Sequence, residues 1–220
     1  MKSLVTTFLV FATCLVIAGT IALIDQAQAT LSLSSGQAGQ LTPAEKARIS
    51  DRTTLSDLRQ KYGDANVREV ADAGDGRPGA VLFPDGSDKR IDVTWADVSR
   101  TKLASFMAWD RKSAWRTPQG VKPGQAIADV ADLNGRAFIL RGFAQPDAGQ
   151  VVSWMGGKLA ELDAGSCHVV VRLTPPPDQE FTTLEWRLAE IVQDAAEVSS
   201  DDRRIKPYKA AVSALGLEWR

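Results

Sequence analysis

Two segments of the chain share one residue pattern at a constant offset. Residues 55–63 read Leu-Ser-Asp-Leu-Arg-Gln-Lys-Tyr-Gly, and residues 127–135 read Ile-Ala-Asp-Val-Ala-Asp-Leu-Asn-Gly. In both segments, apolar residues three positions apart lie on one face of a helix. Both end in glycine, which readily takes the left-handed conformation that ends a helix. The pattern predicts two short helices, each with one buried stripe, and indicates an internal duplication.

Segments typical of strands follow both predicted helices. They lie at 67–70, 79–83 and 89–95 after the first helix, and at 137–143, 150–155 and 167–173 after the second. In the third of these, Ile91, Val93 and Trp95 alternate with polar residues, as in a strand buried on one face. The predicted fold class is therefore α+β, with two related modules, each a short helix followed by an antiparallel sheet of about three strands.

The amino-terminal segment has the layout of an export signal. Lys2 precedes an apolar stretch from Leu4 to Ile24, and Ala27-Gln28-Ala29 places small residues where signal peptidase reads them. Cleavage after Ala29 would leave a periplasmic or secreted chain with no membrane span. The same stretch is long enough to cross a bilayer core of roughly 30 Å, so an uncleaved anchor remains the alternative.

The chain divides into four predicted parts: a signal peptide at 1–29, a flexible leader at 30–40, a first α+β module at 41–110, and a second module with a carboxy-terminal extension at 111–220. The first module opens with Thr42-Pro43-Ala44-Glu45, a capping-box pattern. This pattern predicts a short helix that runs to about Asp51.

Several segments lie outside the duplicated pattern. Residues 101–109 are apolar enough for a strand, and residues 111–119 read as a connecting loop. Residues 184–192 fit both helical spacing and strand alternation, and both alternatives stay open. A final short helix is expected over 206–216, followed by an edge strand at 217–219.

The charge of the chain argues against a nucleic-acid partner, and its cysteine content argues against a disulfide. The chain has 26 basic and 27 acidic residues and a net charge of −1, without a block of like charges, so it lacks the basic surface that nucleic-acid binding needs. Removal of the signal peptide would take away Cys14 and leave Cys167 alone. No disulfide within the mature chain is then expected.

The only histidine of the chain, His168, follows Cys167. Successive residues of a strand point to opposite faces, so the two side chains are not expected to form a catalytic pair. Cys167 is expected to point inward beside Val169 and Val171. No catalytic residue is therefore assigned.

Metal and cofactor sites are not expected either. One cysteine and one histidine cannot supply a zinc site. The Gly-x-Gly-x-x-Gly pattern at 74–79 leads into a strand and not into a helix, which argues against dinucleotide binding. Acid–base catalysis by carboxylates stays open, with candidates that no spacing singles out: Glu180, Glu185, Glu190, Asp201 and Asp202.

Large aromatic side chains are the main indication of a binding function. Trp109, Trp115, Phe143, Trp154 and Trp186 are many rings for one small chain. Rings that do not fit a core serve as anchors in interfaces, and the alternative is that they form the core. Trp115 and Trp154 are expected to be exposed, and Trp115, Phe143 and Trp154 are predicted to bind a partner.

The segment Gly120-Val121-Lys122-Pro123-Gly124, the turn Leu133-Asn134-Gly135 and the strand ending at Trp154 resemble parts of known exported repeat domains. These are the outer-membrane-assembly lipoproteins of the BamE/SmpA type and the tandem modules of β-lactamase-inhibitor proteins. The run from Trp115 to Gly157 is also similar to a group of exported bacterial proteins of unassigned function. The resemblance implies α+β modules and protein binding in the envelope, although no lipid-attachment cysteine is present.

Together these features predict an exported, non-catalytic protein that binds a protein or another envelope component. The first alternative is a periplasmic hydrolase that uses carboxylates or His168. A purely structural envelope protein is a third possibility.

Overall fold

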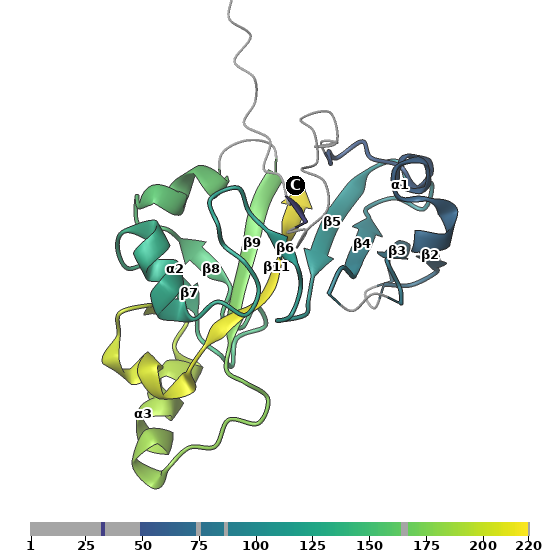
Figure 1. The fold of residues 1–220 in the computed structure, drawn as a ribbon. Helices are drawn as coiled ribbons and strands as arrows, with labels where there is room; N and C mark the ends of the chain where they lie inside the picture. Colours follow the sequence, from purple (N-terminus) through teal and green to yellow (C-terminus); the bar gives the residue numbers. More distant parts are fainter. Residues whose placement is uncertain (1–31, 34–48, 74–75, 86–87, 164–166, 220) are drawn as a thin grey trace, which may run out of the picture.

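The computed structural model describes residues 32–33, 49–73, 76–85, 88–163 and 167–219 (Figure 1). The expected signal peptide at 1–29 lies outside these residues, and so does most of the expected amino-terminal helix at 41–51. The last residues of that expected helix, 49–51, are not helical.

Helices and strands are mixed along the chain, so the predicted α+β class is confirmed. The described helices are α1 (Leu55–Tyr62), α2 (Ile127–Asn134) and α3 (Thr183–Asp194), with the short 3-10 helices η2 (Asp64–Asn66), η3 (Lys158–Asp163) and η4 (Arg203–Tyr208). The described strands are β1 (Ser32–Leu33), β2 (Val67–Val70), β3 (Gly79–Leu82), β4 (Ile91–Trp95), β5 (Leu103–Ala108), β6 (Trp115–Arg116), β7 (Ile139–Arg141), β8 (Val151–Ser153), β9 (Cys167–Thr174), β10 (Glu197–Ser199) and β11 (Ala211–Trp219).

A six-stranded antiparallel sheet forms the centre of the molecule, in the order β2-β3-β4-β5-β11-β9. The last strand of the chain, β11, lies inside this sheet. Its Leu217 is opposite Phe106 of β5 on one side and Val169 of β9 on the other. Figure 1 shows β11 between β5 and β9, where it joins the two halves of the molecule.

Two smaller sheets accompany the large one. A three-stranded sheet has the order β10-β7-β8, and a bridge between Gln150 and Arg172 connects its β8 end to β9. The strands β1 and β6 pair through Leu33 and Trp115. Both short strands lie in segments where the sequence predicted no regular structure, the leader at 30–40 and the loop at 111–119.

Both helices of the duplicated pattern form as predicted, and each ends at its glycine. Their amino-terminal ends differ. Thr54 caps α1, and its side chain accepts a hydrogen bond from the backbone N–H of Asp57. Ala126 precedes α2 and offers no side-chain cap. Gly135 takes the left-handed conformation with φ of 76°, which explains the need for glycine there.

The predicted carboxy-terminal helix at 206–216 is wrong. Residues 217–219 form a strand as expected, but this strand lies inside the sheet and not at its edge. A short 3-10 helix ends at Tyr208, and Ala211–Trp219 forms a strand with partners on both sides. Local propensity does not decide this segment, because pairing with β5 and β9 satisfies its backbone groups on both edges. Gly216 does not end a helix. It lies within β11, where a Cβ atom would come 2.6 Å from the carbonyl oxygen of Phe106.

The sheets do not follow the predicted boundary between residues 110 and 111. A separate sheet of about three strands was expected in each module, but β5 of the first pairs with β11 of the second. An unpaired β5 edge would expose backbone donors and acceptors, and β11 covers them.

Residues 184–192, for which the sequence fits both a helix and a strand, form part of the helix α3. This helix begins with a capping box between Thr182 and Glu185.

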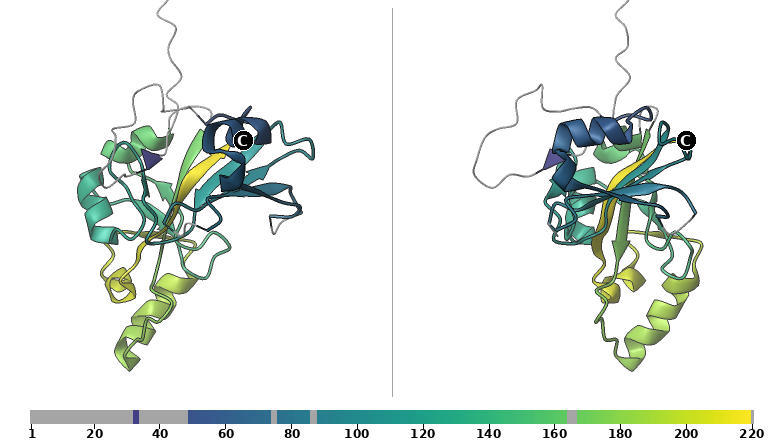
Figure 2. Two further views of the ribbon diagram at one scale, coloured as in Figure 1. Left: turned by 45° about the vertical axis from the view of Figure 1, so that its right-hand side comes forward. Right: turned by 90° about the vertical axis from the view of Figure 1, so that its right-hand side faces the viewer.

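The main hydrophobic core lies on one face of the six-stranded sheet. It contains Val93 and Phe106 of the sheet, Leu58 of α1 and Val130 of α2. The right-hand panel of Figure 2 shows α1 and α2 on the same side of the strands.

The opposite face of the sheet carries a small separate cluster, formed by Met107, Val170 and Ala214. The buried apolar side chains of α1 and α2, Leu58 and Val130, belong to the main core, and so does Val192, a buried side chain of α3. We call the opposite face of the sheet the open face.

Candidate interaction surface

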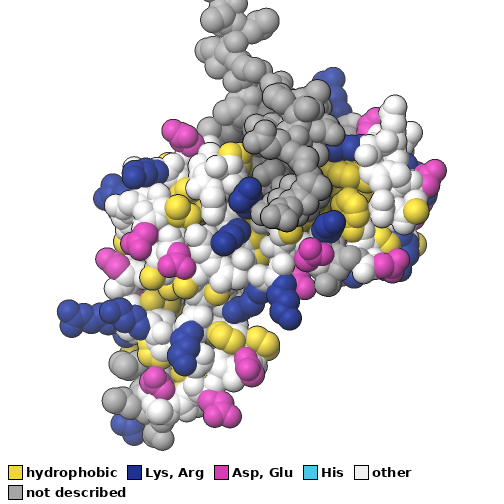
Figure 3. All heavy atoms as spheres, viewed as in Figure 1, with side chains coloured by type: hydrophobic (Ala, Val, Ile, Leu, Met, Phe, Trp, Pro, Cys, Tyr) yellow, Lys and Arg dark blue, Asp and Glu magenta, His cyan; other side chains and the backbone are white. Residues whose placement is uncertain are grey.

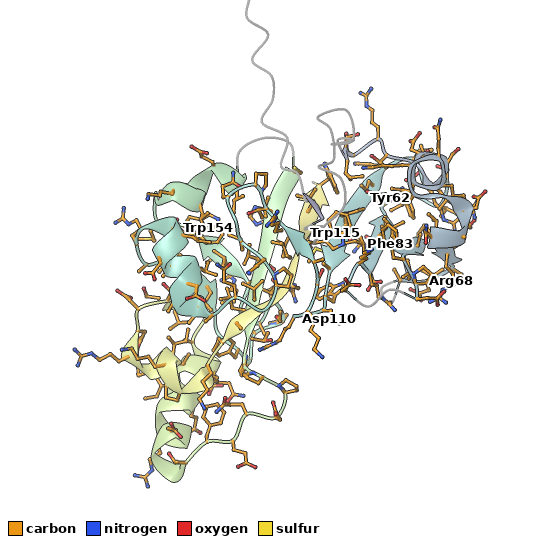
Figure 4. All side chains as sticks on the ribbon, in the orientation of Figure 1. Tyr62, Arg68, Phe83, Asp110, Trp115 and Trp154 are labelled. Carbon is orange, nitrogen blue, oxygen red and sulfur yellow. The ribbon has the colours of Figure 1, made fainter. Side chains whose placement is uncertain are left out.

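The structure buries two of the three aromatic residues that were predicted to bind a partner. Trp115 and Trp154 each keep only 3% of their surface exposed, so their expected exposure is wrong (Figure 4). The ring of Trp115 packs edge-on against Phe106 at 5.8 Å between centroids, and its Nε1 donates a hydrogen bond of 2.9 Å to the carbonyl of Lys89. Trp154 packs at 5.4 Å against Phe138.

Phe143, the third predicted residue, is half-buried and packs against neither of these two aromatic pairs. Its ring packs 4.5 Å from that of Tyr208 in η4, which also contacts Phe181 at 5.1 Å. Burial, with a smaller contribution from the nearby Asp194, raises the pKa of Tyr208. The three predicted residues therefore pack against the main core with different ring partners, and they do not form one exposed surface.

The middle of the open face is a row of residues that face one another across the strands. From β2 to β9 these are Arg68, Val81, Asp92, Met107, Gly216 and Val170. Val81, Met107 and Val170 are buried, and Arg68 at the sheet edge is exposed. A Cβ atom at Gly216 would lie 2.0 Å from Sδ of Met107. Glycine thus lets the methionine side chain lie flat on β11.

A second, more polar row runs parallel to the first. From β2 to β9 it contains Val70, Gly79, Thr94, Ser105, Glu218 and His168. The hydroxyl groups of Thr94 and Ser105 are hydrogen-bonded at 2.7 Å. His168 is directly opposite Glu218. Cys167 is 5% exposed and belongs to the main core beside Val169, which confirms the prediction that the cysteine points inward and that its side chain and that of His168 point to opposite faces.

Trp109 projects from the lower end of the open face. It follows β5 and continues the alternation of Ser105 and Met107, and 51% of its surface is exposed. The guanidinium carbon of Arg172 lies 5.6 Å from the centre of the ring, a cation–π arrangement. Arg172 is the β9 partner of Ala214 in β11. Because alanine is small, the two large side chains can meet across β11.

Arg172 is held by several weak contacts. Its Nη2 donates to Gln150 at 3.3 Å and to Asp147 at 3.4 Å, while its buried Nε lacks a hydrogen-bond partner. The side chain keeps 22% of its surface exposed. The guanidinium therefore depends on the face of Trp109 for part of its packing, and it fixes the orientation of the ring.

The candidate carboxylates mostly cap local structure. Glu185 accepts a hydrogen bond of 2.8 Å from the backbone N–H of Thr182, and hydrogen bonds from that residue hold the pKa of Glu185 below its ordinary value. Asp202 accepts bonds from Arg204, which lower the pKa of Asp202 in the same way. In the described part of the chain, no group of three or more His, Cys, Asp and Glu residues could hold a metal ion.

The face of the molecule drawn in Figure 3 carries basic and acidic side chains interspersed, without a field of one sign. None of the helices in the described ranges is both long and apolar enough to cross a membrane. Comparison of the chain with protein-family models, with curated proteins and with solved structures gives no match.

The sequence names Trp109 among the large aromatic residues, but the predicted partner-binding residues do not include it. The alternation of side chains along β5 indicates on which face of the sheet Trp109 lies. Phe106 and Ala108 point into the core, so Met107 and Trp109 must point the other way. Trp115 appeared exposed because its segment reads as a loop, whereas the ring covers Phe106.

Proposed function

We propose that this chain is an exported, non-catalytic protein that binds a partner protein through the open face of its sheet. The observation that carries the proposal is the half-exposed Trp109, which continues the alternation of β5 on the face of the sheet opposite the main core. The periplasm or the cell exterior is the proposed location, in line with the signal-like amino-terminal sequence.

The chemistry of Trp109 supports this role. A tryptophan ring presents a large apolar area with few rotatable bonds, and such rings are enriched among the residues that dominate binding energy. Arg172 already restricts the ring, so little conformational freedom remains to be lost on binding. Val81 and Met107 on the same face keep only 5% and 3% of their surface exposed, so Trp109 provides the exposed apolar area there.

The order of elements supports the proposed origin from two tandem modules. In the first half α1 precedes β2, β3, β4 and β5, and in the second half α2 precedes β7, β8 and β9, with α3 and β10 inserted before β11. The last strand of each set then pairs with the other. The alternative, a periplasmic hydrolase that uses carboxylates or His168, has less support, because the candidate carboxylates Glu185 and Asp202 accept hydrogen bonds in local caps.

The test compares Trp109→Ala with Val98→Ala. Val98 is 86% exposed and lies between β4 and β5, away from the open face. Proteins captured from envelope extract by the unchanged chain are identified, purified and titrated against all three forms by calorimetry. Loss of an interface anchor costs about 2 kcal/mol or more, so we expect binding at least about 30-fold weaker for Trp109→Ala. Val98→Ala should bind normally.

Val98→Ala should unfold at the same urea concentration as the unchanged chain, because Val98 is 86% exposed, whereas Trp109→Ala should be slightly less stable, because Arg172 loses the ring it packs against, but still fully folded under the binding conditions. Equal affinity of all three forms for the purified partner would contradict the proposal.

A further inference from the structure

The sequence contains a single Asn-Gly pair, Asn134-Gly135, and Asn66 is its only other asparagine. An asparagine followed by glycine loses its side-chain amide more readily than other asparagines, because no side chain hinders the approach of the glycine nitrogen to that amide. Asn66 is followed by Val67, whose branched side chain does hinder the approach. The chain therefore carries one labile asparagine and one internal reference.

The reaction at such a pair needs water and no enzyme. The backbone nitrogen of Gly135 bonds to Cγ of Asn134 and closes a cyclic succinimide. The Cγ–Nδ2 bond breaks, and Nδ2 leaves as ammonia with the proton of the Gly135 N–H. Water then opens the ring and leaves aspartate or isoaspartate. The two steps together exchange an amide for a carboxyl group and involve no oxidation.

In the folded chain, hydrogen bonds engage both reacting groups. The backbone N–H of Gly135 donates to the carbonyl of Asp132 at 3.1 Å, so the attacking nitrogen is not free to lose its proton. In the amide of Asn134, Nδ2 donates to the carbonyl of Trp154 and Oδ1 accepts from the backbone N–H of Leu159. Closing the ring would break these bonds.

Packing also prevents the amide from turning. Asn134 is 1% exposed, so solvent water does not reach it. A Cβ atom at Gly157 would lie 2.2 Å from Oδ1 of Asn134, which means that the backbone of Gly157 lies directly against the amide. Ring closure therefore requires local opening, in which the end of α2 separates from η3 and from the turn after β8.

The product of the reaction does not fit the place of the amide. An aspartate at this position is negatively charged and has no donor, whereas the amide donates to the carbonyls of Trp154 and Arg136. These carbonyls would face a carboxylate, and a buried charge without a partner is costly. Isoaspartate would in addition lengthen the backbone by one carbon at the end of α2.

We propose that Asn134-Gly135 is a site of spontaneous deamidation that the folded chain suppresses. Opening of the α2 end exposes the pair to water, and deamidation of an opened chain prevents the network around Asn134 from closing again. The modification thus removes chains that stay open from the folded population. This inference is independent of the proposed partner binding, because Asn134 and its contacts share no residue with the open face.

The experiment follows deamidation of the full chain by peptide mass spectrometry at about pH 8.5, in buffer and in guanidinium chloride above the unfolding midpoint. In denaturant we expect Asn134 to react at least about tenfold faster than Asn66. In buffer we expect Asn134 to react at least about 100-fold more slowly than in denaturant, because a stable chain is rarely open. Equal rates for Asn134 in the two solvents, or a rate in denaturant no higher than that of Asn66, would overturn the proposal.

A variant tests whether packing sets the rate. Gly157→Ala should speed the reaction of Asn134 in buffer at least about tenfold, because the added Cβ displaces the amide. Val98→Ala is the control and should leave the rate unchanged, since Val98 is 86% exposed. An unchanged rate in a folded Gly157→Ala variant would refute the assigned protection.

A second variant tests the effect of the product. Asn134→Asp should unfold at a lower denaturant concentration than the unchanged chain, or fail to fold. Asn66→Asp is the matched control, because Asn66 is exposed, and it should be close to the unchanged chain in stability. An Asn134→Asp variant as stable as Asn66→Asp would show that deamidation does not keep the network open.

Discussion

Asn134 is the buried polar side chain on which the second half of the molecule depends most. It is 1% exposed and stands at the last position of α2. Its Nδ2 donates to the carbonyl oxygens of Trp154 at 3.0 Å and Arg136 at 3.1 Å, and its Oδ1 accepts from the backbone N–H of Leu159 at 3.0 Å. One side chain thus ties α2 to the segment after β8 and to η3.

We expect Asn134→Ala to lower the free energy of unfolding by about 3 kcal/mol, because it leaves buried donors and acceptors without partners. Urea unfolding measures the loss. Asn66→Ala is the matched control, since Asn66 is exposed and donates one hydrogen bond, to the carbonyl of Tyr62. A loss for Asn134→Ala no larger than that for Asn66→Ala would show that the network contributes little.

At the scale of the element, α1 and α2 have aligned sequences but different amino-terminal ends. Asp57 and Asp129 occupy the same position of the two helices, but only α1 has a capping side chain, Thr54. The hydrogen bonds from Thr54 lower the pKa of Asp57 below its ordinary value. The contribution of this carboxylate to stability is therefore complete above the pKa of the unfolded chain, and it is lost as the pH falls through the lower pKa of the folded state.

This difference between the two helices predicts that the loss of stability caused by Asp57→Asn depends on pH. The variant should be less stable than the unchanged chain near neutral pH. The difference in stability should begin to shrink as the pH falls below about 4, where the unfolded chain takes up the proton, and should close only below the lower pKa of the folded state, where the carboxyl is protonated in both states. Urea midpoints measured between pH 2 and 7 test it. Asp129→Asn should produce a smaller gap, because Ala126 offers no reciprocal bond. The same pH-dependent gap for both variants would count against the capping argument.

At the scale of the whole molecule, β11 makes the two halves one cooperative unit. It pairs with β9 along most of its length and with β5 from Leu215 to Glu218, so unfolding of either half removes partners from the other. One main core spans both halves and includes Leu58 of the first and Phe138 of the second.

We therefore expect a single unfolding transition, seen alike by tryptophan fluorescence and circular dichroism. Leu58→Ala should destabilise it by about 2–5 kcal/mol and Phe138→Ala by about 3–5 kcal/mol, since each leaves a cavity at a fully buried site. Both variants should lower the denaturant concentration at the midpoint of the same single transition, and Val98→Ala should not change this concentration. Two separate transitions, each sensitive to one variant, would show that the halves unfold independently.

The local features of this chain could be predicted from its sequence. The helices ending at Gly63 and Gly135 and the alternation of Ile91, Val93 and Trp95 follow from residues close together in the chain, and the structure confirms them. The inward direction of Cys167 followed from the two-residue period of a strand. Of the candidate surface, only the presence of Trp109 among the large rings could be stated in advance.

Tertiary structure decided the rest. Ala211–Trp219 becomes a central strand because β5 and β9 offer edges on both sides, and no pattern within those nine residues reveals partners that lie far away in the chain. Likewise, Trp115 is buried and Trp109 exposed because of what packs against each ring. The hydrophobic period of a sequence indicates which side chains share one face of a helix or strand. Which of these faces is buried depends on the packing of segments that are far apart in the chain.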